Sequence, residues 1–216
     1  MSFFKKKNYS KGLLSKDISE YSVEFQSFWN NFIIEPMSLI RSEVNTDFLL
    51  KIEGDERSLM LQVLRNSLNE NDKKFYMIEA LALLKDKDSV EALSKLLKEQ
   101  TEIEWKLRIS KALYSIGENP VYFQVLQELI DLGDSKKLSF YQHLLLDLKN
   151  EKAVSALIRL LNPESGESSF QALTLLNSMK TGARYTIADD HLPYNADYFL
   201  ERRDDIDFLK ELAGKI

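Results

Sequence analysis

A helical pattern that recurs along the chain constrains this sequence more than any other feature. The stretch FYMIEALALLKDKDSVEALSKLL at 75–97 returns as FYQHLLLDLKNEKAVSALIRLL at 140–161. A third copy lies between them, where Ala112-Leu113 and Ile116-Gly117 correspond to Ala80-Leu81 and Leu84. The repeating unit is therefore about 32 to 33 residues, or two helices and two short turns, which is typical of a helical solenoid.

The second helix of each unit carries the repeat most clearly. Its aligned apolar residues are Val90, Phe123 and Val154, then Leu93, Leu126 and Leu157, then the pairs Leu96-Leu97, Leu129-Ile130 and Leu160-Leu161. A single pair of helices cannot bury such a stripe without neighbours, so we expect these residues to face a shared core.

These residues resemble HEAT repeats of the short, bacterial kind. The resemblance covers about residues 55–180 and is carried by Ala112-Leu113 with Ile116-Gly117, and by Val-x-Ala-Leu-x-x-Leu-Leu at 90–97 and 154–161. It implies a curved stack of helix pairs whose second helices line the concave side. Most members of this family are protein-binding scaffolds, while minorities act on DNA bases or modify bilin chromophores.

The predicted fold is an all-α superhelix, a HEAT-like solenoid with atypical capping helices at both ends. We expect a flexible basic arm at 1–16 and one solenoid domain at 17–216. Within that domain, 17–54 would form the N-terminal cap, 55–180 the repeats and 181–216 the C-terminal cap. Terminal units of solenoids are atypical because one of their faces has no neighbouring repeat.

Capping residues and helix breakers place the predicted helices. An aromatic stripe from Ile18 to Ile33 predicts one helix that ends before Pro36. The later predicted helices are 38–52, one that Asp55 caps, 73–84, 89–99 with Asp88 or Ser89 as its cap, 102–116 ending at a left-handed Gly117, 120–132, 135–148 after Gly133 and Asp134, 151–161, 167–179 and 201–213. The interval 183–200 shows no helical period.

The charge distribution disfavours a nucleic-acid partner. The net charge is −5, and residues 1–16 contain five Lys and no acid, so the remaining 200 residues carry −5 − 5 = −10. A broad nucleic-acid footprint needs Lys and Arg gathered on one face. The chain has no Cys, no apolar run after its basic start and no stretch of 18 apolar residues. We therefore expect a cytoplasmic protein that contacts no membrane.

Few residues offer chemistry. His143 is expected to be a partly buried structural residue. The cluster Asp189-Asp190-His191 is either a cation site or, as we favour, an acidic surface. The aromatic residues Tyr185, Tyr194, Tyr198 and Phe199 either pack the C-terminal cap or anchor a partner.

An enzyme is the alternative prediction. DNA glycosylases built on this fold suggest a possible site that consists of Asp72, Asp131 and Arg159. The alternative function is therefore either a DNA-glycosylase-like activity or DNA binding without catalysis. However, the expected concave helices carry both signs of charge, which holds phosphate weakly. We therefore predict no catalytic residue, no cofactor and no metal.

The predicted function is non-catalytic binding of a protein partner on the concave face. The predicted site consists of the surface positions of the aligned second helices: Glu91, Gln124 and Ser155, and one turn later Lys95, Glu128 and Arg159. A scaffold or adaptor, and an immunity protein that neutralises a basic toxin, are both compatible with this site. We expect a monomer or a weak homo-oligomer.

Overall fold

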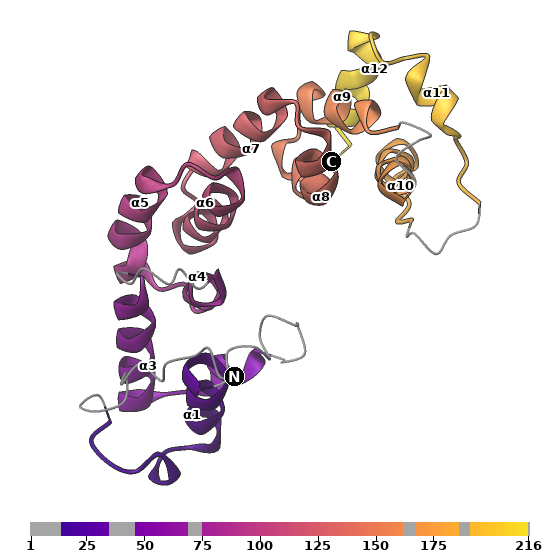
Figure 1. Cartoon of the computed structure of the whole chain (residues 1–216). Coiled ribbons are helices and arrows are strands. Elements are labelled where there is room, and N and C mark those ends of the chain that lie inside the picture. Colours follow the sequence, from indigo (N-terminus) through magenta and orange to yellow (C-terminus); the bar gives the residue numbers. More distant parts are fainter. Residues whose placement is uncertain (1–13, 35–45, 69–74, 162–166, 186–190, 216) are drawn as a thin grey trace, which may run out of the picture. The chain divides into compact units, whose positions relative to one another are not determined.

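The chain divides into two compact units, Met1–Pro120 and Val121–Ile216. The computed structural model describes residues 14–34, 46–68, 75–161, 167–185 and 191–215. Every regular element in these ranges is a helix and none is a strand, which confirms the predicted all-α class (Figure 1). In the same ranges no helix is both long enough and apolar enough to cross a membrane.

The first unit is built from short helical segments followed by longer helices. Its elements are η1 (Ile18–Glu20), α1 (Val23–Phe28), the π-helical η2 (Trp29–Ile34), η3 (Asp47–Lys51), α3 (Gly54–Ser67), α4 (Phe75–Leu83), η4 (Lys87–Ser89), α5 (Val90–Glu99) and α6 (Ile103–Gly117). Both α4 and α5 pack against α6, and α3 packs against α4.

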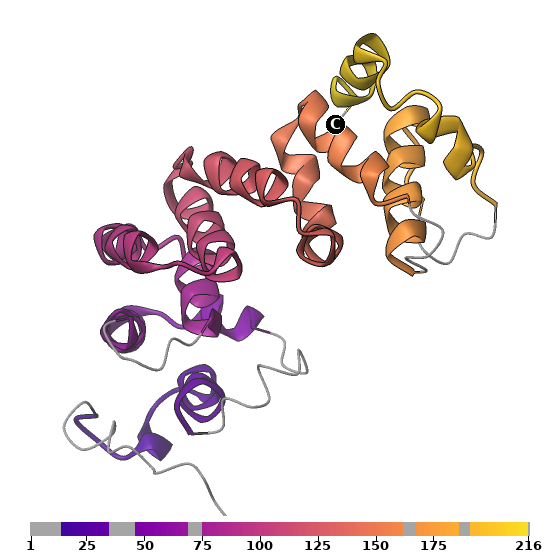
Figure 2. The ribbon, with the colours of Figure 1, turned by 45° about the horizontal axis from the view of Figure 1, so that its top comes forward.

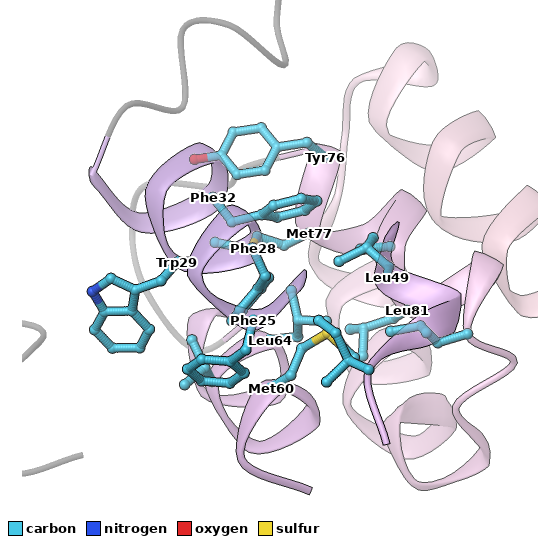
Figure 3. Close-up of a cluster of buried hydrophobic side chains, with 14 of the residues drawn as sticks. Phe25, Phe28, Trp29, Phe32, Leu49, Met60, Leu64, Tyr76, Met77 and Leu81 are labelled. Carbon is cyan, nitrogen blue, oxygen red and sulfur yellow. The ribbon is translucent and has the colours of Figure 1, made fainter. Parts of the chain in front are cut away.

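An aromatic cluster forms the start of the core in this unit. Phe25, Phe28 and Phe32 are almost completely buried and lie along one side of α1 and η2, facing Met60 of α3 (Figure 3). The ring of Phe32 lies 5.7 Å from that of Tyr76 on α4 in an edge-to-face arrangement, which is favourable between aromatic quadrupoles. The aromatic stripe seen in the sequence is therefore a packing surface.

The single helix predicted from Ile18 to Ile33 is wrong. Asp17 caps the short turn η1 in a capping box with Glu20, and the backbone then becomes extended at Tyr21. Ser22 caps a new helix, α1, by accepting a hydrogen bond from the amide of Phe25. Two caps within five residues divide the helix, because each one satisfies free amides at a separate helix start.

A partly buried ion pair holds α3 to the turn between α4 and α5. Arg65 donates from Nε to Asp86 at 2.8 Å and from Nη2 to the other oxygen of the same carboxylate. Arg65 also reaches Asp88 at 2.9 Å. The side chain of Asp86 is only 5% exposed, so the two-pronged contact compensates for the loss of its hydration.

The predicted helix caps agree with the structure only in part. The helix α3 begins at Gly54, so Asp55 lies inside its first turn. Ser89 is the N-cap residue of α5, one of the two predicted, but its hydroxyl donates to the carbonyl of Asp86 and makes no capping hydrogen bond. Asp88, the other candidate, lies in η4 and pairs with Arg65. At the end of α6 the left-handed residue is Glu118, with φ 55°, because the helix extends through Gly117.

The second unit contains the remaining helices. They are α7 (Val121–Leu132), α8 (Ser135–Tyr141), η5 (Gln142–Leu148), α9 (Glu151–Arg159), α10 (Glu167–Thr181), α11 (Ala196–Leu200) and α12 (Ile206–Ala213). Gly133, with φ 64°, and the cap Asp134 stand as predicted before α8. The predicted helix 135–148 is instead divided into α8 and the 3₁₀ segment η5.

The helix α9 is the centre of this unit. It packs against α7, η5, α10, α11 and α12 (Figures 1 and 2). The five residues of α9 that are at most 1% exposed are Ala153, Val154, Ala156, Leu157 and Ile158. Burying each of the larger side chains contributes about 1.5–3 kcal/mol.

A buried side-chain amide on α10 holds residues 191–215, which we call the C-terminal segment. Asn177 is fully buried, donates from Nδ2 to the carbonyl oxygen of Tyr194 at 2.9 Å, and accepts the amide of Tyr194 on Oδ1 at 2.9 Å. Asn195 then caps α11, which the sequence pattern did not predict. Asp205 caps α12, so the last helix starts at Ile206 and not at 201.

The repeat-aligned leucines are predicted to set stability. Leu93 and Leu157 are both completely buried, so Leu→Ala at either position should lower the free energy of unfolding by ~2–5 kcal/mol through lost transfer energy and a residual cavity. Glu91→Ala and Arg159→Ala change exposed residues two positions away on the same helices, and should cost no more than about 0.5 kcal/mol. Urea denaturation followed by circular dichroism measures all four, and the reverse order would contradict the assigned helix faces.

The Asn177 amide should hold the C-terminal segment in place. Asn177→Leu removes both hydrogen bonds to Tyr194 and should destabilise the second unit by about 1–3 kcal/mol, the usual cost of unpaired polar groups. Hydrogen exchange should quicken in α11 more than in α7. Lys210→Leu, on an exposed position of α12, is the control. Unchanged exchange in α11 after Asn177→Leu would show that the amide does not anchor the segment.

Candidate functional site

One strip of α9 remains accessible after its neighbours have packed. Lys152, Ser155 and Arg159 are three and four residues apart, so they lie along one side of the helix. Lys152 and Arg159 are exposed, and Ser155 is half-buried. Because apolar residues occupy the other sides of α9, this strip is where the centre of the unit meets solvent.

A hollow lies beside this strip. It has a volume of about 600 Å³ and combines residues of α9 with residues from the C-terminal segment. Its lining residues are Ser155, Ile158, Arg159, Leu161, Leu200, Arg203 and Asp204. Its residues Ile158 and Leu161 are buried, whereas its charged residues Arg159, Arg203 and Asp204 are exposed, so we refer to an apolar floor and a charged rim.

A smaller hollow of about 380 Å³ adjoins the first, since the two share Ser155 and Arg159. It is lined by Ile130, Asp131, Glu151, Lys152, Ser155, Arg159 and Leu209. We refer to the two hollows together as the α9 groove. It is formed by the end of α7, the exposed strip of α9, the turn after α11 and α12.

Acidic and basic side chains both line the α9 groove, but only some of them have an ion-pair or hydrogen-bond partner among the described residues. Arg203 pairs with its neighbour Asp204 at 3.4 Å, and side-chain exposures of 67% and 90% make this contact weak. Asp131 accepts a hydrogen bond from Gln127 at 2.8 Å. Within the described part of the chain, the side chains of Lys152 and Arg159 make neither an ion pair nor a hydrogen bond. These two cations therefore have free donors.

Ion pairs elsewhere in this unit are structural. Lys180 of α10 contacts Glu211 of α12 at 2.8 Å, and Lys215 contacts the same carboxylate at 3.0 Å. The hydrogen bond from Lys180, followed by that from Lys215, holds the pKa of Glu211 below its ordinary value. None of these three residues lines the α9 groove.

The six residues predicted as a binding site are dispersed over three helices. Glu91 and Lys95 are exposed on α5 in the first unit. Gln124 is exposed and Glu128 half-buried on α7, and neither lines a hollow of the groove. Ser155 and Arg159 line both hollows. That the six residues form one binding surface stays a prediction.

Sequence reasoning missed the part of the groove that comes from the C-terminal segment. Leu200, Arg203, Asp204 and Leu209 lie beyond the last repeat, and no repeat position points to them. One signal was present, because Asn195 and Asp205 are strong helix-capping residues in front of short apolar runs. Caps predict that short helices exist there but not which surface they cover.

The other candidate residues have different outcomes. Asp131 and Arg159 do line the same hollow, while Asp72, Asp189 and Asp190 lie outside the described residues. His191 is exposed, and His143 is also exposed, so the expectation that it is partly buried is wrong. Over the described ranges, no group of three or more His, Asp or Glu side chains is placed to hold a metal ion.

The aromatic residues of the C-terminal segment divide into two kinds. Phe199 is completely buried and lies 5.2 Å from the ring of Tyr198 and 6.3 Å from that of Phe208. Tyr194 and Tyr198 are half-buried, and their ring centroids lie 4.4 Å apart in a tilted arrangement, with the guanidinium of Arg202 4.0 Å from the Tyr198 ring. Phe199 therefore packs the cap, as one of the two predicted roles requires.

Chemically, the lining of the α9 groove offers ion pairs, one hydroxyl and apolar contact. Among the described residues, no His lines either hollow, and His is the side chain that most often serves as a general base near neutral pH. An apolar floor with a charged rim is the arrangement found in protein–protein interfaces.

Comparison of the chain with family models, with curated proteins and with solved structures finds no match to any of the three.

Proposed function

We propose that this chain is a non-catalytic protein-binding module, a HEAT-like solenoid that holds a protein partner against its second helices. The observation that carries the proposal is the α9 groove, in which Ser155 and Arg159 meet an apolar floor and a charged rim. Complete burial of Leu93, Leu126 and Leu157 on three successive second helices supports the repeat architecture. A rigid surface of this kind lowers the ordering cost of association.

Two roles fit this proposal, a scaffold for a larger complex and an immunity protein that neutralises a toxin. The charge of −10 over residues 17–216 favours the second when the toxin is a basic protein, such as a nuclease, because opposite net charge accelerates encounter. The lack of Cys fits a reducing compartment, and we propose the cytoplasm as the site of action.

A DNA-glycosylase-like or DNA-binding function is the second candidate. One observation favours it, because Asp131 and Arg159 line the same hollow and a carboxylate beside a cation is part of such sites. The groove also contains Glu151 and Asp204, whose charges repel phosphate. Protein binding is therefore the stronger proposal.

A partner captured from the native cell should depend on the groove. The partner would be purified and its affinity measured by calorimetry. Arg159→Glu should weaken the complex at least tenfold, because it places a carboxylate where a free cation stands. Lys136→Glu, an exposed change on α8, should have little effect. Lys95→Glu tests separately the prediction that α5 also contacts the partner, and it should weaken the complex if that prediction is right.

Deleting residues 1–13 tests whether the basic arm, and not the groove, holds the partner. Ser15 and Lys16 contact Tyr21, so the deletion stops before them and leaves that contact intact. The partner should still bind. If binding is lost on this deletion and survives Arg159→Glu, the partner is held by the basic arm and the proposed surface is incorrect.

DNA should bind only weakly. Fluorescence anisotropy with a labelled 20-base-pair duplex at 150 mM salt should give no complex tighter than the ~1–100 μM of non-specific binding. The same assay should be repeated with a duplex containing an abasic site. A sub-micromolar complex with either duplex, weakened by Asp131→Asn or Arg159→Gln, would favour the enzyme alternative over protein binding.

A further inference from the structure

Two arginines line the larger hollow of the α9 groove, Arg159 and Arg203, and neither makes a two-pronged contact with a carboxylate in the described ranges. Arg159 has no side-chain partner in the ranges that the structure describes, and Arg203 is held only by its chain neighbour Asp204 at 3.4 Å. Of the described residues that line this hollow, Asp204 is the single acid, and its side chain is 90% exposed. A planar guanidinium binds a carboxylate through two parallel hydrogen bonds, so both arginines offer unused capacity for an anion.

The opposite end of the groove adds two carboxylates. Asp131 and Glu151 line the smaller hollow together with Lys152 and with Arg159, which the two hollows share. From Glu151 to Arg159 the helix rises about 12 Å, at ~1.5 Å per residue. An extended peptide covers that distance with about four residues, at ~3.3 Å each. Apolar lining comes from Ile158 in the larger hollow and from Leu209 in the smaller one.

We propose that the α9 groove binds an extended, internal segment of a protein, with an Asp or Glu side chain between Arg159 and Arg203. A Lys or Arg about three residues away would face Asp131 and Glu151, and an apolar side chain between them would rest on Ile158. This inference rests on the proposed function and specifies the partner at the same site. Two adjoining hollows that share Ser155 and Arg159 offer side-chain sites to a passing segment on either side of these residues.

Short synthetic peptides test this directly. Four acetylated and amidated hexapeptides would carry Glu or Gln at position 2 and Lys or Gln at position 5, with Leu between them. Chemical-shift changes would be followed on the isotope-labelled full chain. We expect saturable shifts at Ser155, Ile158 and Leu200 with both Glu peptides, at least fivefold tighter for the peptide that also carries Lys.

Variants of the chain test whether the Glu peptides bind at the two arginines of the groove. Arg159→Gln with Arg203→Gln should weaken the Glu peptides at least fivefold and leave the Gln peptides unchanged. Lys210→Gln, on an exposed part of α12 outside the groove, should change neither. Both exposed substitutions leave the core intact, which a thermal melt verifies. Equal binding of Glu and Gln peptides, no saturable shift, or binding that survives the double variant would each overturn the proposal.

Two further titrations test whether an anion other than an internal Glu side chain binds at the same place. A Gln peptide with a free terminal carboxylate that binds as tightly as the Glu peptide would assign the site to a chain end and overturn the internal segment. Inorganic phosphate producing the same shifts at equal concentration would assign it to a general anion. If the peptides fail while Arg159→Glu still weakens the native partner, the proposed function stands and only this segment assignment falls.

Discussion

The second unit depends on the burial of a single short helix. Five of the nine residues of α9 are removed from solvent by α7, η5, α10, α11 and α12. A helix enclosed in this way can expose only the side that its neighbours leave uncovered, so the polar strip of Lys152, Ser155 and Arg159 is a consequence of the packing. The apolar pattern that stabilises the unit and the polar strip that forms the groove belong to the same helix period.

The repeat pattern predicted the core better than it predicted the ends. Leu93, Leu126 and Leu157 are buried because each lies at the same phase of an amphipathic helix, and phase can be read from local spacing. The division of the first predicted helix could not be read in this way, since Ser22 caps α1 inside a continuous aromatic stripe. Capping there overrides a pattern that on its own is compatible with one long helix.

For a related reason, the sequence predicted only part of the candidate site. Ser155 and Arg159 follow from the repeat, whereas Arg203 and Leu209 reach the groove only because the C-terminal segment returns to α9. That return depends on contacts distant in sequence, among them the two hydrogen bonds between Asn177 and Tyr194. No local period records a contact between residues seventeen positions apart, so the second wall of the groove needed the structure.

The aromatic cluster of the first unit has an optical consequence. The chain contains two Trp residues, Trp29 and Trp105, and both belong to the first unit. Trp29 is 3% exposed and its ring stacks near Phe25, so its emission responds to the loss of this core. Tryptophan fluorescence therefore reports on the first unit alone, while circular dichroism reports on the helices of both. The separation between the two unfolding curves measures how far the units melt independently.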